Sequence, residues 1–325
     1  MKYYTPSVNA LALLLGISLL FAAPGCTKTS KAKKTWNLAK EGVFSATFSK
    51  QYALMGSTSG KAILWELGKK NVLHTWQHGK DAEGGVVAVD ISGDEKYAIT
   101  AERNSLAWWR IKDGKLLGSW GFPFIKSVSL SKDGRFALIG MNERALYFAL
   151  QYGKTVYRFD HQGPVGATAL SADGKFALTG SDDTTAKLWQ LENGKLRHTW
   201  NHRSKIASVA ISAKSRFAAT SEALGETRIW SPKSGKLKRT VGPKVMTISS
   251  AAFSPNEKYL ATGRTSQRID LWRIKSGKSM KSWIPKKADD WRPSASTILA
   301  LEFTGKGKAL LSAASNGYAQ MWKVR

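Results

Sequence analysis

The chain has 325 residues, of which 42% are hydrophobic and 22% charged, so it is long enough to bury one large core. Its 50 Lys and Arg residues outnumber 23 Asp and Glu residues, and the net charge of +27 favours anionic partners. Cys26 is the sole cysteine, which excludes an intramolecular disulfide, and the few carboxylates, most of them in expected turns, argue against general acid–base catalysis.

Residues 1–25 have the features of an export signal. Their apolar run, residues 10–23, is shorter than the roughly 20 residues that span a bilayer as a helix. The run leads into the sequence APGC at residues 23–26, which resembles the bacterial lipobox, whose cysteine receives a diacylglycerol. The resemblance implies lipidation of Cys26, and Thr27 in the sorting position implies the outer membrane, facing the periplasm. The alternative is an ordinary secretory signal with an incidental cysteine.

Residues 26–34 (CTKTSKAKK) are polar and basic, which is typical of a solvated tether. The alternative is that the four lysines rest on anionic lipid headgroups. We therefore divide the chain into a lipoprotein signal peptide (residues 1–25), a basic tether (26–34) and one folded domain (35–325).

A pattern of about forty residues recurs through the folded domain, and residues 161–200 are its clearest copy. Short runs of alternating apolar and polar residues are separated by the turn sequences ADGK, SDD and NGK, which predicts four strands and three hairpin turns. An aromatic residue near the end of each third strand repeats seven times, at Trp65, Trp109, Phe148, Trp189, Trp230, Trp272 and Trp322. Seven four-stranded sheets that bury one another's faces in a ring predict a β-propeller.

The segment LSADGKFALTGSDDTTAKLW, residues 170–189, resembles the WD40 repeat. The match extends residue by residue to His161, Thr179, Asp183 and Trp189, which the resemblance implies form a buried hydrogen-bonded set. It implies an all-β, seven-bladed propeller that acts as a non-enzymatic scaffold for protein partners. The lipobox resemblance adds an anchor in the envelope membrane through the lipid on Cys26.

The two ends of the domain are complementary. The sequence TWN at residues 35–37 repeats the fourth-strand sequences at residues 75–77 and 199–201, yet no first three strands precede it. The last unit has three expected strands and stops before a fourth. We therefore predict that the N-terminal strand completes the last blade and closes the ring.

One face of the propeller is expected to carry the first-to-second and third-to-fourth turns of every blade. Ten lysines fall in these turns: Lys96, Lys115, Lys132, Lys175, Lys195, Lys214, Lys236, Lys258, Lys278 and Lys306. They suggest a surface that binds anionic envelope polymers or lipid headgroups. The alternative is that hairpin turns favour glycine beside a solvated residue, and that lysine opposes edge aggregation.

The opposite face gathers the connections between blades and the second-to-third turns. Its connection at residues 284–296 contains Trp291 and Arg292, a combination that suits protein recognition, although the segment could instead cap a blade edge. Four arginines in second-to-third turns are further candidates for partner binding and are expected to point toward the central opening: Arg103, Arg144, Arg264 and Arg268.

We expect no metal, cofactor or catalytic residues. His161 and His202 precede first strands by four residues, where the resemblance implies hydrogen bonds within the blade rather than metal ligation. A quinone-cofactor propeller enzyme is a third alternative, because such repeats also place a Gly-Lys turn before a tryptophan, as in Gly194-Lys195 before Trp200. Nucleic acid is not an expected partner of an exported protein, despite the charge.

Overall fold

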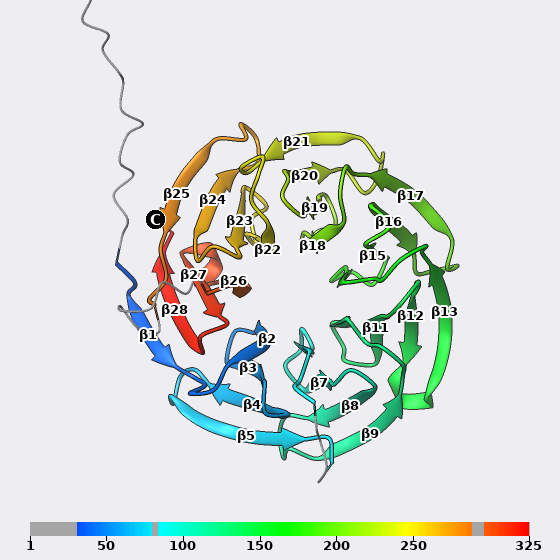
Figure 1. Ribbon diagram of the computed structural model, residues 1–325, viewed down its shortest axis with the longest axis vertical. Coiled ribbons are helices and arrows are strands. Elements are labelled where there is room, and N and C mark those ends of the chain that lie inside the picture. The colour runs from blue at the N-terminus through cyan, green and yellow to red at the C-terminus, as the bar shows by residue number, and fades with distance from the viewer. Residues whose placement is uncertain (1–30, 80–83, 288–295, 325) are drawn as a thin grey trace, which may run out of the picture.

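The computed structural model describes residues 31–79, 84–287 and 296–324. In these residues seven antiparallel sheets of four strands are arranged around a central axis (Figure 1), which confirms the predicted seven-bladed propeller. The first strand of each blade lies innermost and the fourth lies on the circumference.

The strands of the first three blades follow the predicted repeat. Blade 1 comprises β2 (Val43–Phe48), β3 (Tyr52–Ser57), β4 (Lys61–Glu66) and β5 (Asn71–Gln77). Blade 2 comprises β6 (Ala88–Ile91), β7 (Tyr97–Ala101), β8 (Ser105–Arg110) and β9 (Leu116–Gly121). Blade 3 comprises β10 (Ser127–Leu130), β11 (Phe136–Gly140), β12 (Arg144–Ala149) and β13 (Lys154–Asp160), with the 3-10 turn η1 (Leu150–Tyr152) before β13.

The next three blades repeat the same order. Blade 4 comprises β14 (Ala167–Leu170), β15 (Phe176–Gly180), β16 (Thr185–Gln190) and β17 (Leu196–Asn201). Blade 5 comprises β18 (Ile206–Ile211), β19 (Ala218–Glu222), β20 (Thr227–Trp230) and β21 (Leu237–Val241). Blade 6 comprises β22 (Ile248–Phe253), β23 (Tyr259–Arg264), β24 (Ile269–Arg273) and β25 (Ser279–Trp283).

Blade 7 is built from both ends of the domain. Its strands β26 (Ile298–Thr304), β27 (Ala309–Ala314) and β28 (Tyr318–Lys323) come from the C-terminal end, and the 3-10 turn η2 (Gly305–Gly307) joins the first two. The fourth strand is β1 (Lys34–Asn37), which pairs antiparallel with β28 so that Trp36 lies opposite Ala319. The predicted closure by the N-terminal strand is confirmed.

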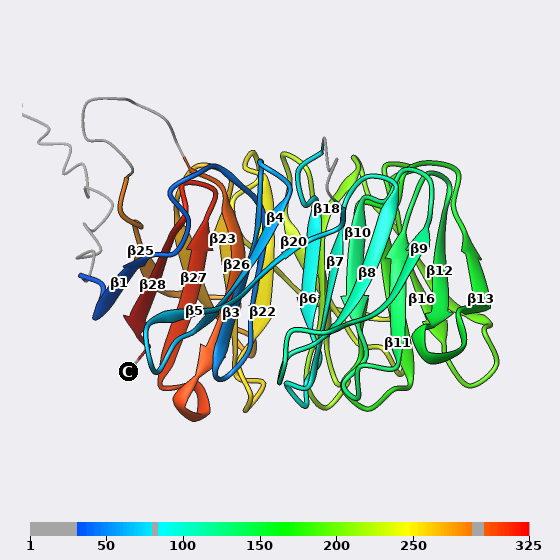
Figure 2. The same ribbon diagram turned by 90° about the horizontal axis from the view of Figure 1, so that it is seen from below.

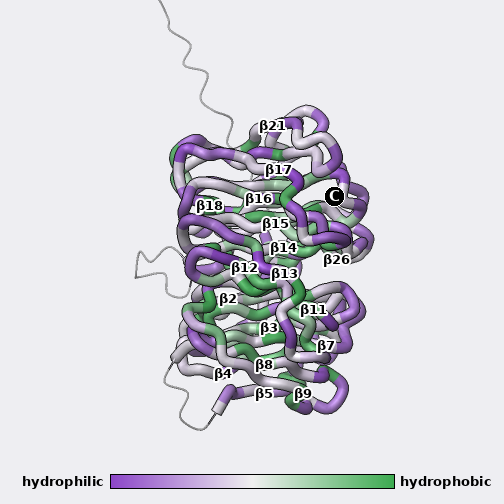
Figure 3. The backbone as a smooth tube through the Cα atoms, turned by 90° about the vertical axis from the view of Figure 1, so that its right-hand side faces the viewer, coloured by the Kyte–Doolittle hydropathy of each residue, from purple (hydrophilic) through white to green (hydrophobic). Residues whose placement is uncertain are grey.

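Burial decreases from the middle of each blade toward its outer edge. Second strands such as β3 and β19 are almost entirely buried, because neighbouring blades cover both of their faces. Fourth strands such as β21 are mostly exposed. In Figure 3 hydrophobic residues accordingly concentrate within the blades, whereas the turns at both ends of the strands are hydrophilic.

Aromatic residues on the fourth strands pack one blade against the next. The Trp76 and Trp109 rings stack at 5.1 Å, and the Trp200 and Trp230 rings stack at 5.0 Å with an interplanar angle of 9°. These pairs join a fourth-strand tryptophan of one blade to a third-strand tryptophan of the next. Blade 5 differs, because Val241 occupies the position that Trp200 holds in blade 4.

Candidate protein-binding face

A histidine-centred set of hydrogen bonds fastens blade 4. His161, in the connection before β14, donates from Nδ1 to Asp183 Oδ2 at 2.8 Å, and its Nε2 pairs with Thr179 Oγ1 at 2.8 Å. Trp189 on β16 donates from Nε1 to the same Thr179 oxygen at 2.9 Å. The structure thus joins the four residues that the WD40 resemblance singled out.

The surroundings of Asp183 and His161 determine the protonation state of each side chain. Burial acts to raise the pKa of Asp183, but hydrogen bonds from Thr185, the Gln162 N–H group and His161 outweigh it and hold the pKa at about 2. Burial lowers the pKa of His161, although the nearby Asp183 opposes this. At neutral pH a charged carboxylate therefore accepts a bond from a neutral imidazole, which orders the connection rather than presenting a reactive group.

Blades 2 and 5 contain similar hydrogen-bonded sets. The sequence predicted the contact of His202 within its blade but not that of His78. His78 Nε2 pairs with Thr100 Oγ1 at 2.7 Å, and Trp109 Nε1 donates to that oxygen at 2.8 Å. His202 Nε2 likewise pairs with Thr220 Oγ1 at 2.9 Å. His78 was not assigned this role from the sequence, although the shared frame of HTWQH at residues 74–78 and HTWNH at 198–202 carries the signal.

All five histidines are engaged by protein atoms. Besides the three in these sets, His74 Nε2 bonds the Ile111 carbonyl at 2.7 Å and His198 Nε2 bonds the Pro232 carbonyl at 3.1 Å. Within the part of the chain that the structure describes, no three His, Cys, Asp or Glu residues cluster as metal ligands would.

Comparison with known families finds WD40 repeats in two parts of the chain. The WD40 model, described as WD domain, G-beta repeat, matches residues 153–190 and 235–273. The first range contains all four members of the blade 4 set. The fold is a seven-bladed β-propeller, and two stretches of its repeats match the WD40 model.

Two relatives of this propeller show how far the similarity extends. U3 small nucleolar RNA-associated protein 12 from Saccharomyces cerevisiae is 28% identical over 110 residues, 33% of this chain and 12% of the relative. Guanine nucleotide-binding protein subunit beta from Solanum tuberosum is 25% identical over 147 residues, 41% of this chain and 39% of the relative. The chain thus spans well under half the length of each relative.

Apolar side chains are exposed on the face that carries the connections between blades and the second-to-third turns, here the connection face. Most of these residues lie in connections or turns rather than in strands: Phe44, Phe124, Leu224, Val245, Met246 and Ile284. Leu224 and Val245 are the most exposed, at 71% and 72%. The Leu224 N–H group bonds Thr247 Oγ1 at 3.2 Å, which brings the second-to-third turn of blade 5 beside the connection to blade 6. Leu224, Val245 and Met246 therefore form an apolar patch, here the blade 5/6 patch.

The predicted partner-binding arginines occupy different settings. The guanidinium of Arg103 lies 5.0 Å from the centre of the exposed Phe124 ring on the connection face. Arg264 contacts Asp270 at 2.5 Å, and Arg268 contacts the same carboxylate at 3.0 Å, so both are held within blade 6. Arg144 is the first residue of β12 and Arg264 the last of β23, which corrects their placement within turns.

The four arginines were also predicted to point toward the central opening, but none of them lines it. The central channel has a volume of about 300 Å³ and is lined by first-strand residues and Gly166, with none of the four arginines among them. Second-to-third turns lie farther from the axis than first strands, which accounts for the difference (Figure 1).

Three predicted site residues lie outside the described part of the chain. They are Trp291 and Arg292 of the long connection and the candidate lipidation residue Cys26. In the described residues no helix is both long and apolar enough to cross a bilayer.

The turns on the other side of the ring form a second surface, here the turn face (Figure 2). All ten lysines predicted in first-to-second and third-to-fourth turns are exposed in these turns. The turn face is therefore rich in exposed lysine, whereas the connection face presents the exposed apolar side chains described above together with lysine and arginine.

The channel contains two carboxylates that the sequence did not single out. Asp90 on β6 accepts hydrogen bonds from the Leu130 N–H group at 2.7 Å and the Ile91 N–H group at 2.9 Å, yet burial raises its pKa to about 6. Burial, reinforced by the charge of Asp90, raises the pKa of Glu302 on β26 to about 7. No lysine or arginine is among the channel-lining residues that the structure describes, so no cationic side chain there pairs with these two carboxylates.

Replacing Glu302 with glutamine should stabilise the protein at alkaline pH. A carboxyl group with a raised folded-state pKa favours folding while protonated and loses that contribution as the pH rises from its ordinary value of 4.5 through about 7. We expect Glu302→Gln to increase the free energy of unfolding by about 2–3 kcal/mol at pH 8 and to change it little at pH 4.

Urea denaturation at the two pH values measures this difference. Glu41→Gln, at an exposed position, is the matched control and should have no effect at either pH. An equal change at pH 4 and pH 8 for Glu302→Gln would show that the effect is packing rather than ionisation.

Proposed function

We propose that this protein is a non-enzymatic scaffold that binds protein partners through its connection face. The observation that carries the proposal is the blade 5/6 patch, where Leu224 and Val245 are more than two-thirds exposed. Exposed apolar groups rimmed by polar residues mark interaction surfaces, and Arg103 over Phe124 adds the aromatic and arginine chemistry common at binding hot spots.

The relatives support an association role without naming a partner. One is named as a subunit of a guanine nucleotide-binding protein, and the other is named for association with a small nucleolar RNA. We further propose that Cys26 is lipidated and that the residues between it and β1, whose first residue is Lys34, tether the propeller to the bacterial outer membrane, facing the periplasm. This part of the proposal rests on the apolar run and the APGC sequence.

A pull-down from envelope extract tests the scaffold. The bait is residues 26–325 with Cys26→Ser, washed at low and at high salt, because packed apolar contacts resist screening. We expect discrete proteins to remain at high salt and their recovery to fall at least about tenfold with the double substitution Leu224→Asp and Val245→Asp. Leu196→Asp, on the exposed strand β17, is the control and should capture them normally.

Two results would contradict the scaffold proposal. Capture that survives the charged substitutions would remove the blade 5/6 patch from the interface. Visible absorbance from a bound quinone in the purified protein would instead favour the enzymatic alternative.

The lysines of the turn face support a second candidate function, binding of anionic envelope polymers or lipid headgroups. Ten exposed lysines on one face create a field that decays within about 8–10 Å at physiological salt. Material bound in this way should wash off at high salt and should be insensitive to Leu224→Asp and Val245→Asp.

A further inference from the structure

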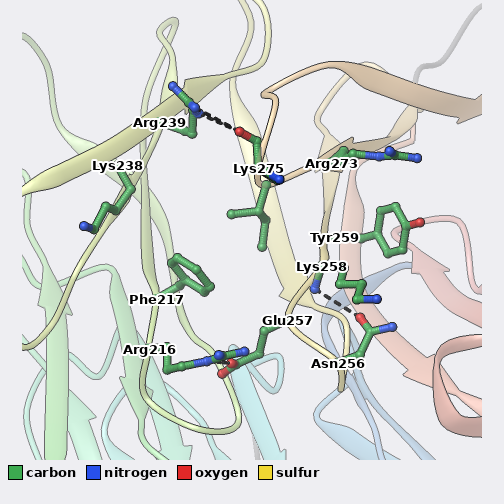
Figure 4. Close-up of a pocket in the computed structure, with 11 residues that line it drawn as sticks. Arg216, Phe217, Lys238, Arg239, Asn256, Glu257, Lys258, Tyr259, Arg273 and Lys275 are labelled. Carbon is green, nitrogen blue, oxygen red and sulfur yellow. Dashed lines mark hydrogen bonds and ion pairs between the residues drawn. The ribbon is translucent and has the colours of Figure 1, made fainter.

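A cavity of about 630 Å³ opens between blades 5 and 6, on the side of the turn face (Figure 4). Apolar side chains form part of its wall: Phe217, Tyr259 and Ile274. Its other lining residues include six cationic side chains, namely Arg216, Lys238, Arg239, Lys258, Arg273 and Lys275. We call this cavity the 5/6 groove.

The single carboxylate in the 5/6 groove is already engaged. Glu257 is ion-paired with Arg216 and accepts a hydrogen bond from the Lys214 N–H group at 2.9 Å. Burial acts to raise the pKa of Glu257, but hydrogen bonds from Ser212, Arg216 and Lys214 outweigh it and lower the pKa. Glu257 therefore stays charged and neutralises only one of the six cations.

Most of the remaining cations have no carboxylate partner in the described part of the chain. This holds for Lys238, Lys258, Arg273 and Lys275, none of which forms an ion pair there. The Arg239 guanidinium donates to the Lys275 carbonyl at 2.9 Å and 3.1 Å, which leaves its charge uncompensated. The groove thus concentrates positive charge beside an apolar wall.

The equivalent groove between blades 1 and 2 is an internal reference. It has a volume of about 510 Å³ and contains the same turn sequence, Arg110-Ile111-Lys112, in place of Arg273-Ile274-Lys275. Its next residue, Asp113, holds Arg110 at 2.7 Å, whereas the 5/6 groove has Ser276 at that position. Glu66 also lines the reference groove, where blade 5 has Ser231, whereas Glu95 there is the counterpart of Glu257.

Differences on the fourth strand also make the 5/6 groove more positively charged than the reference groove. Lys238 and Arg239 precede Val241 by three and two residues, where Leu73 and His74 precede Trp76. The two grooves therefore share a backbone plan, and each of these replacements makes the 5/6 groove more cationic.

The junction of blade 5 with blade 6 has Val241 where the junction of blade 1 with blade 2 has Trp76. Trp76 stacks on Trp109 and donates from Nε1 to the Gly114 carbonyl at 3.1 Å, which fastens blade 1 to the turn of blade 2. Val241 can form neither contact with blade 6. Cavities of this size accommodate a few side chains of a ligand.

We propose that the 5/6 groove binds an acidic peptide segment of a protein partner, with an apolar side chain of that segment against Phe217 and Ile274. The inference rests on the proposed scaffold function and names a second contact for the partner. Carboxylates fit the unpaired cations, and the apolar wall suits a chain that mixes acidic and apolar residues. A uniformly charged polymer or a membrane surface would use the broad lysine surface of the turn face rather than a groove with an apolar wall.

Fluorescence anisotropy of the full-length protein with a short fluorescein-labelled peptide that alternates glutamate and leucine tests the proposal. Ser276→Asp gives Arg273 the partner that Asp113 gives Arg110, and we expect it to weaken peptide binding about tenfold. Lys238→Gln should weaken binding in the same direction. Asp113→Ser, the reverse change in the reference groove, is the control and should leave binding unchanged.

Several outcomes would overturn the proposal. These are equal affinity of Ser276→Asp and wild type, equal affinity for the peptide with glutamine in place of glutamate, or Ser276-dependent binding of polyphosphate or phosphatidylglycerol vesicles without peptide binding. Thermal melting verifies that each variant is folded. Because the assay uses an isolated peptide, its failure leaves the Leu224 and Val245 pull-down unaffected, and failure of that pull-down leaves peptide binding measurable.

Discussion

Replacement of Trp200 by alanine is expected to lower the free energy of unfolding by about 3–5 kcal/mol. The Trp200 ring is 4% exposed and stacks on Trp230 of the next blade at 5.0 Å. Its Nε1 also donates to the Gly235 carbonyl at 3.0 Å, and Gly235 lies in a turn of that blade. The substitution therefore opens a cavity and leaves a partly buried carbonyl without its donor, and both effects act at a junction between blades.

Urea denaturation compared with Leu196→Ala measures this loss. Leu196 lies on the same strand, β17, but is 48% exposed, so its truncation should cost less than about 1 kcal/mol. Similar losses for the two variants would show that the stacked tryptophans do not hold blades 4 and 5 together.

Removal of residues 1–37 is expected to lower the free energy of unfolding by on the order of 5 kcal/mol, which is comparable to the whole stability of many domains. This deletion eliminates β1 and exposes the edge of β28, whose backbone groups then lack partners. It also removes Trp36, which packs against the core shared by blades 1 and 7. Thermal melting and size-exclusion chromatography should show an early transition and association through the open edge.

Removal of residues 1–30 is the matched control, because β1 remains. A synthetic peptide covering residues 31–40 should restore the melting temperature of the longer deletion when added in excess, since β1 contributes through pairing with β28 rather than through its connection to β2. Unchanged stability of the longer deletion would mean that ring closure contributes little.

The repeat was predictable because each strand end carries its own local signal. Turns such as Asp113-Gly114 and Asn193-Gly194 place glycine at a φ of about 70°, where other residues are strained, so the sequence marks them directly. The fourth-strand sequence at Trp36 predicted closure for the same reason. Local turn chemistry and a repeating aromatic are sufficient for blade number and order.

The surfaces depend on contacts that a repeat does not encode. His78 precedes Val86 by eight residues whereas His161 precedes Val165 by four, so the longer connection hid an equivalent hydrogen bond to Thr100. Asp90 and Glu302 lie on different blades, and only the closed ring brings their charges together. The 5/6 groove likewise results from the junction of β21 with blade 6 rather than from either blade alone.

The strand pairing of blade 7 has a consequence for the order in which the protein is made. Thr35 and Gln320, whose side chains bond at 3.1 Å, are separated by 285 positions, so β1 is synthesised long before β28 exists. A growing or translocating chain can form individual blades from local hairpins, but it cannot complete the circle until the last strand emerges. We expect the nascent chain to present an open edge throughout that interval, which makes the final step the one most dependent on chaperones.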